Sequence, residues 1–219
     1  PMHLYAHAEL ETLLRPWLNF FCKGIAYEVV IHALPTDEAS HLLYEDRSVE
    51  VYSLPLRHRV PSCGFLFREK APLPHIRRDM IDYLEIPYYA INSIKQGADW
   101  TTADGRVVPN RELVFPAERG RSYAYCSDTC YQPQLIPLLR GVDVLYHEAT
   151  FGQDNLPRAI ETLHSTAAQA ASLAKAAGVG RLVIGHYSSR YDDEQVLLNE
   201  AQQVFMNTTL AQEGMVINI

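Results

Sequence analysis

The stretch "HSTAAQAASLAKAAGVGRLVIGH", residues 164–186, indicates how this chain folds. Residues 164–178 are rich in alanine and leucine, and Ser165 or Thr166 can cap the helix that such a run favours. Residues 181–186 then form a short apolar, β-branched run typical of a buried strand. A helix that leads directly into a buried strand is the repeating unit of an α/β protein, so we expect helices packed on a sheet.

The alternation of strands and helices continues on both sides of this stretch. Further strands are predicted at residues 2–6, 27–35, 48–56, 63–69, 122–128, 142–150 and 214–219. Further helices are predicted at residues 8–22, 133–141 and 192–205. Between residues 71 and 118 the regular alternation stops. This segment contains prolines, tyrosines, a short helical pattern at 76–86 and the turn "ADGR". This middle segment is predicted to be an inserted arm.

Composition limits the classes of function. The chain has 219 residues, 47% of them hydrophobic, which suits one globular domain with a sizeable core. A net charge of −7 argues against non-specific duplex binding, so DNA is not an expected partner. The four cysteines form no CxxC pair, which favours a reducing cytoplasm. No apolar run approaches the roughly 20 residues of a membrane span, so no membrane partner is expected.

Polar and titratable side chains follow four of the predicted strands. They are His58, Asp128, the pair His147 and Glu148, and the pair His186 and Arg190, with His164 at the start of the helix quoted above. A single histidine at such a place is more often structural than functional. Four strand ends that meet at one edge of a sheet can instead form a site, and imidazole with carboxylate ligands suits zinc. Strand alternation turns His147 away from Glu148, so a structural role is expected for it.

Five motifs in order carry a resemblance to a known family. They are "YSLPLRHRVPSCGF" (52–65), "ADGRVV" (103–108), "YAYCSDT" (123–129), "HEATF" (147–151) and "GHYSSRY" (185–191). Over residues 2–219 the chain resembles ribonuclease Z, the tRNA 3′-processing endonuclease family of the metallo-β-lactamase superfamily. The resemblance implies a metallo-β-lactamase-like αββα sandwich, incomplete at the N-terminus. Residues 1–219 would be the C-terminal portion of that single domain, with a protruding substrate-binding arm at about 72–116.

The resemblance also implies roles for individual residues. His58 would bind one Zn²⁺ and His186 a second, with the Asp128 carboxylate bridging the two ions of the complete site. Two ions can stabilise the oxygens of in-line phosphodiester cleavage. His164, supported by Glu148, would protonate the leaving oxygen, because a carboxylate favours the charged, proton-donating imidazole. For substrate binding, Arg190 would hold a phosphate near the scissile bond, together with Ser188.

The sequence departs from the family in two places. The H-x-H-x-D-H string that supplies the remaining metal ligands lies upstream in the family and does not occur here. We therefore expect a chain that lacks an N-terminal section, binds zinc weakly or not at all by itself, and has little activity alone. The arm has "IPYYAINSIKQGADW" (86–100) where the family's bacterial arm carries a Gly-Pro pair. RNA contacts and ordinary surface roles both remain open for Tyr88, Tyr89, Arg77, Arg78 and Lys95.

The function implied by the resemblance is removal of the 3′ trailer from precursor tRNA by a zinc-dependent homodimer, leaving a 3′-hydroxyl on the tRNA. One alternative is a hydrolase of the same superfamily that acts on small phosphodiesters, sulfate esters or lactones, which has no need of an arm. A second alternative is a non-catalytic half that binds RNA or a partner subunit. The joint presence of the strand-end residues favours the enzyme over this last interpretation.

Overall fold

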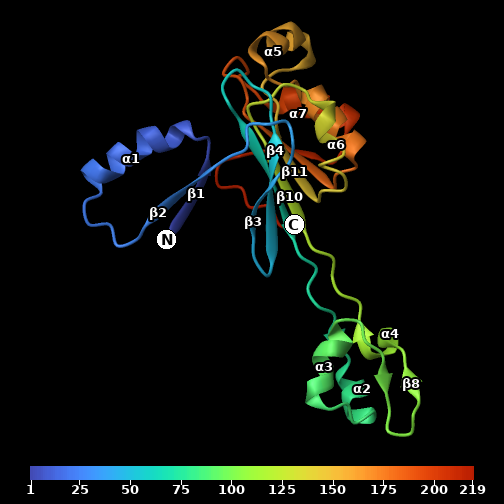
Figure 1. The fold of residues 1–219 in the computed structure, drawn as a ribbon. Helices are drawn as coiled ribbons and strands as arrows, with labels where there is room; N and C mark the ends of the chain where they lie inside the picture. The colour runs from blue at the N-terminus through green and yellow to red at the C-terminus, as the bar shows by residue number, and fades with distance from the viewer. The chain divides into compact units, whose positions relative to one another are not determined.

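A computed structural model describes residues 1–219 and divides them into two compact units. The first unit comprises Pro1–Arg68 and Arg121–Ile219, and the second comprises Glu69–Gly120. Figure 1 shows both units, coloured along the chain. None of the helices combines the length and the apolar character that a membrane span requires.

The first unit is built on a seven-stranded sheet. The strand order is β13 (Thr208–Leu210), β12 (Arg181–Gly185), β11 (Val144–Glu148), β10 (Ser122–Cys126), β5 (Cys63–Glu69), β4 (Val49–Pro55) and β3 (Leu42–Glu45). Strands β10 to β13 are parallel to one another, and β5 pairs antiparallel with β10. The carboxyl ends of β10, β11 and β12 therefore meet at one edge, which is where α/β sheets place their sites.

Two helices cover one face of this sheet, as Figure 1 shows: α6 (Ala167–Ala177) and α7 (Gln195–Val204). They pack against each other and against strands β11, β12 and β13. The inner face of α6 consists largely of buried alanines with Leu173, and it meets Leu145 and Leu182 of the sheet. Small side chains let the helix lie close to the sheet, which fixes the segments just before α6 and just after β12.

The N-terminus of α6 is closed by a capping box. Thr166 Oγ1 accepts a hydrogen bond from the backbone N–H of Gln169, whose side chain accepts one from the Thr166 N–H. Each bond satisfies a donor that the first helical turn leaves unpaired. Thr166 is thus the cap, one of the two residues that the sequence offered.

Replacing Thr166 with alanine is expected to lower the free energy of unfolding by about 1 kcal/mol, the usual cost of losing a cap. Urea denaturation followed by circular dichroism measures this change. Thr162→Ala is the matched control, because the Thr162 hydroxyl donates only to the Arg158 carbonyl of its own helix, α5 (Leu156–Thr162). Equal stability of the two variants would contradict the capping role.

A β–α–β segment opens the chain. Strands β1 (Met2–Ala6) and β2 (Val29–Ala33) pair in parallel, and α1 (Glu9–Phe21) connects them. Pro16 lies inside α1, and none of the residues of this helix is buried. Trp17, Phe20 and Phe21 are all exposed on it.

The second unit has its own small core. It contains β6 (His75–Ile76), α2 (Arg78–Tyr83), α3 (Tyr88–Lys95), β7 (Trp100–Thr101), β8 (Val107–Val108), α4 (Asn110–Leu113) and β9 (Val114–Phe115). Ile86, Ile94 and Leu113 are buried at its centre. The turn "ADGR" joins β7 to β8, as its sequence predicts.

Most elements predicted from the sequence are confirmed, and two are wrong. Residues 133–141 form a 3₁₀ turn, Pro133–Leu135, followed by irregular turns rather than a helix. Pro137 lacks an N–H and opposes a continued helix there. Residues 214–219 form no strand, because β13 already occupies the sheet edge beside β12. Strands β3 and β13 and helix α5 were not predicted.

Candidate metal centre and acid pair

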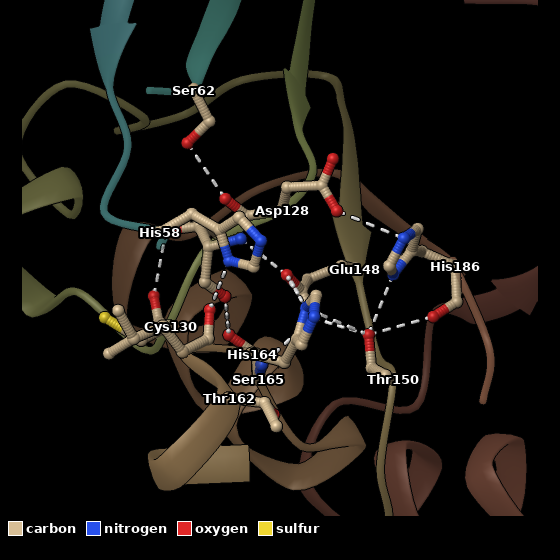
Figure 2. A network of polar contacts seen from close by, with 12 residues as sticks. His58, Ser62, Asp128, Cys130, Glu148, Thr150, Thr162, His164, Ser165 and His186 are labelled. Carbon is tan, nitrogen blue, oxygen red and sulfur yellow. Dashed lines mark hydrogen bonds and ion pairs between the residues drawn. The ribbon is translucent and has the colours of Figure 1, made fainter. Parts of the chain in front are cut away.

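Four titratable side chains converge at the edge where the parallel strands end. One ligand atom from each of Asp128, Glu148, His164 and His186 lies within 4.8 Å of the others. Asp128 follows β10, Glu148 ends β11, His164 precedes α6, and His186 follows β12. Figure 2 shows these side chains pointing toward one another, together with His58. The ends of three parallel strands and the segment before α6 therefore position the four side chains.

The backbone is strained at two members of this cluster. Asp128 has φ 59° and His186 has φ 60°, the left-handed region that side chains other than glycine seldom adopt. Leu163, the residue before His164, also lies there, with φ 57°. Residues held in this conformation cluster at functional sites, because the surrounding structure must stabilise them. Both residues are held in this conformation with their side chains 3.1 Å apart.

The Glu148 carboxylate is buried and accepts several hydrogen bonds. Its oxygens accept from the backbone N–H groups of Thr129 and Ser165 and from the Thr150 hydroxyl. His164 Nδ1 lies 3.0 Å from each of its two oxygens. Burial raises the pKa of Glu148, but these hydrogen bonds outweigh it and hold the pKa below its ordinary value. The carboxylate therefore stays charged.

The charged carboxylate acts in turn on His164. The hydrogen bond from Glu148 raises the pKa of His164 above its ordinary value of 6.5, although partial burial opposes this shift. Because His164 Nδ1 is bound to Glu148, the ring is oriented with Nε2 free to donate a proton. A buried carboxylate that orients an imidazole in this way is typical of a general acid.

His58 reaches the cluster from the loop after β4. Its Nδ1 lies 3.0 Å from the carbonyl oxygen of Leu163, and its ring centroid lies 4.7 Å from that of His164. A backbone carbonyl bound to one ring nitrogen fixes the tautomer and leaves the other nitrogen as a potential ligand. The structure thus brings His58 beside the four-residue cluster.

His186 lies between two oxygen atoms. Its Nε2 is 3.1 Å from Asp128 Oδ1, and its Nδ1 is 2.9 Å from Thr150 Oγ1. The sequence analysis did not single out Thr150, although the strand predicted at residues 142–150 would place it on the same face as Glu148. The backbone donors of Thr129 and Ser165 were missed as well, and side-chain patterns give no signal for them.

The two residues predicted to bind substrate, Ser188 and Arg190, differ from each other in their surroundings. The Ser188 N–H donates to the carbonyl of Thr150, which ties the loop after β12 to the strand end of β11. Arg190 is exposed, and its backbone N–H lies 3.4 Å from Ser188 Oγ. The structure does not bring its guanidinium into contact with the cluster.

A groove of about 660 Å³ opens beside His58. Its walls include Arg57, Arg59, Tyr131 and Gln132. Asp37 and Glu38 line the groove as well, so its walls carry charges of both signs.

His147, for which strand alternation predicts a structural role, lies buried beside the cluster. Its side chain is fully buried, with Nδ1 2.7 Å from the carbonyl oxygen of Glu148 and Nε2 without a partner. Burial lowers the pKa of His147, so the ring stays neutral. Cys126 is also fully buried, and burial raises the pKa of its thiol to about 12.

The depressed pKa of His147 predicts a pH-dependent stability. Below its ordinary value of 6.5 the unfolded chain takes up a proton that the folded chain resists, so stability falls as pH falls. His147→Leu is expected to lose this component, which reaches at most about 1.4 kcal/mol per pH unit. Urea denaturation between pH 5 and 8 measures it, with exposed His75→Leu as control. Parallel pH profiles for wild type and His147→Leu would contradict the prediction.

Comparisons with known proteins agree with this architecture. Residues 95–187 match the family described as "Beta-lactamase superfamily domain". Human tRNase Z, short form, superposes with a TM-score of 0.62 at 22% identity, over 100% of this chain and 68% of that one. The chain is 53% identical over 218 residues to ribonuclease Z of Phocaeicola vulgatus and 42% identical over 217 residues to that of Azobacteroides pseudotrichonymphae. It covers 70% and 69% of those two relatives.

The parallel strand ends, the cluster they deliver and the structural likeness define the class: an α/β protein with the metallo-β-lactamase fold. Relatives at about half identity over the whole chain narrow this further. The chain belongs to the ribonuclease Z family.

Proposed function

We propose that this protein is a zinc-dependent endoribonuclease that removes the 3′ trailer from precursor tRNA and leaves a 3′-hydroxyl on the tRNA. The observation that carries the proposal is the cluster at the strand ends, where the Glu148–His164 pair lies beside Asp128 and His186. The relatives named ribonuclease Z supply the substrate class.

The donor set fits zinc. Imidazole nitrogens and carboxylate oxygens without thiolates are ordinary zinc ligands. His186 Nε2 lies 3.1 Å from Asp128 Oδ1, so an imidazole nitrogen and a carboxylate oxygen stand close enough to bind one cation together. We assign His58, Asp128 and His186 as the residues of this chain that hold zinc, two ions in the complete site. When bound, zinc supplies Lewis acidity and a lowered pKa for water.

The residues of the chain itself supply the proton. His164, held by Glu148, keeps a proton near neutral pH because its pKa is raised. In the proposed reaction its Nε2–H donates that proton to the oxygen that leaves the scissile phosphate. Glu148 stays charged and keeps the ring oriented. Arg190 and Ser188 are proposed to bind a substrate phosphate, as their loop adjoins the cluster.

The arm is proposed to bind the tRNA at a distance from the cleaved bond. Residues 1–219 as a whole are proposed to be the C-terminal portion of one domain. Tyr88 and Tyr89 are 90% and 82% exposed, which is the state that base stacking requires. Arg77 pairs with Asp79 at 2.6 Å and is less available for phosphate. We further propose a cytoplasmic homodimer; the four cysteines are free, as a reducing compartment requires.

A cleavage assay on a 3′-extended precursor tRNA tests the proposal. It compares this chain with a version extended to the relatives' length, each with added Zn²⁺ and with a chelator. Zinc-dependent release of the trailer by the extended version is the expected result. Cleavage that persists in the chelator would contradict the metal assignment.

The alternatives give different outcomes in the same assay. A small-molecule hydrolase would spare the precursor and hydrolyse bis(p-nitrophenyl) phosphate, with or without residues 72–116. A non-catalytic half would cut neither substrate but would still bind the precursor, which a gel-shift assay measures. Either pattern would overturn the proposed function.

A further inference from the structure

We propose that Thr150 is a positioning residue that joins the acid pair to His186 through one buried hydroxyl. The inference rests on the proposed function, because it assigns Glu148 and His164 to proton donation and His186 to metal binding. Thr150 itself contacts neither substrate nor metal in this proposal. It acts through the residues that do.

The hydroxyl of Thr150 contacts three members of the cluster, Glu148, His164 and His186, as Figure 2 shows. Its Oγ1 is 2.7 Å from Glu148 Oε2, 2.9 Å from His186 Nδ1 and 2.9 Å from the His186 carbonyl oxygen. A longer contact of 3.4 Å reaches His164 Nδ1. Thr150 is only 6% exposed, so little water can replace these contacts.

The single Thr150 proton has two acceptors within reach, the Glu148 carboxylate and the His186 carbonyl oxygen, and their strengths decide between them. A hydroxyl carries one proton and two lone pairs. The charged Glu148 carboxylate, at the shortest distance, is the strongest acceptor for that proton. The Thr150 oxygen is then left to accept from His186 Nδ1–H. This arrangement leaves His186 Nε2, the nitrogen that faces Asp128, as the one available to a metal.

The same residue also holds the loop that carries His186. The Thr150 carbonyl accepts from the Ser188 N–H at 3.1 Å, two residues beyond the left-handed His186. Thr150 therefore restrains His186 from both its side chain and its backbone, and it restrains Glu148 as well. One residue therefore links the carboxylate that orients the proton donor to the loop that carries the metal ligand.

Three variants test this role in the chain itself. Thr150→Val keeps the shape and removes the hydroxyl, and Thr150→Ser keeps the hydroxyl. Thr208→Val is the matched control, because Thr208 is 2% exposed and its hydroxyl donates only to the Phe205 carbonyl. Long-range ¹H–¹⁵N spectra of the histidine rings are recorded at fixed pH for each. Thr150→Val is expected to change the ring-nitrogen signals of His164 and His186 together. Thr150→Ser and Thr208→Val are expected to leave both near wild type.

Zinc affinity and kinetics on precursor tRNA give the second readout, using the version extended to the relatives' length. Thr150→Val is expected to lower zinc affinity and kcat by roughly 10–100-fold with KM unchanged, and Thr150→Ser is expected to restore both. Unchanged His186 signals in Thr150→Val would overturn the proposal. If those signals change while wild type neither binds zinc nor cuts precursor, the linkage stands and the proposed function fails.

Discussion

Replacing His164 with alanine is expected to lower kcat for cleavage of precursor tRNA by roughly 10²–10⁴-fold, the range for loss of a general acid. The reason is the buried Glu148 carboxylate, which keeps His164 protonated and correctly turned. Zinc affinity should change little, because this histidine is assigned to proton donation rather than to the metal. Single-turnover cleavage with saturating enzyme measures the chemical step, and exposed His3→Ala is the control.

The pH profile separates an acid from a merely structural histidine. The pKa of His164 is raised above 6.5 in the folded protein, so its acid form persists above that pH and is lost as pH rises through the raised value. Glu148→Gln removes the charge that raises the pKa, and the alkaline limb of kcat should then move to lower pH. An unmoved alkaline limb, or a His164→Ala variant as fast as wild type, would exclude the acid role.

Replacing Asp128 with asparagine is expected to have the other large effect. Asparagine tolerates the left-handed conformation at this position, so the backbone is retained while the negative charge is lost. We expect zinc affinity to fall by more than the roughly 100-fold that loss of an outer hydrogen-bond partner costs, with activity falling alongside. Competition with a chelating dye measures the affinity of the version extended to the relatives' length.

Exposed Asp192→Asn is the matched control for this substitution, since it removes the same charge away from the cluster. Circular dichroism establishes that both variants are folded. If Asp128→Asn kept the zinc affinity of the wild type, Asp128 would not be a zinc ligand. His186 would then lack the second ligand that the proposed site requires.

The sheet was largely predictable because its strands are short apolar runs. Runs such as residues 181–186 are bounded by turn residues and have few other places to fold. The failures came where an apolar pattern met a competing constraint. Pro137 interrupts the helical pattern of residues 133–141, and the apolar segment 214–219 finds the sheet edge already occupied by β13.

The convergence of polar side chains was predictable for the same topological reason: parallel strands place their carboxyl ends together. The individual contacts within the cluster could not be predicted. The bond between His58 and the Leu163 carbonyl joins residues 105 positions apart, and the left-handed turns at Asp128 and His186 have no local sequence signal. Thr150 had a signal, its shared face with Glu148, but threonine in a strand is too common to single out.

The second unit begins and ends at almost the same point. A side chain placed on Gly120 would collide with the Glu69 carbonyl oxygen, and Ser122 pairs with Arg68 across strands β10 and β5. In topological terms the whole of Glu69–Gly120 is the loop of a β-hairpin, enlarged until it acquired a core of its own. A two-residue turn could close the same hairpin. Because the unit has its own core, a change in its length or sequence does not require repacking of the strands that carry the cluster.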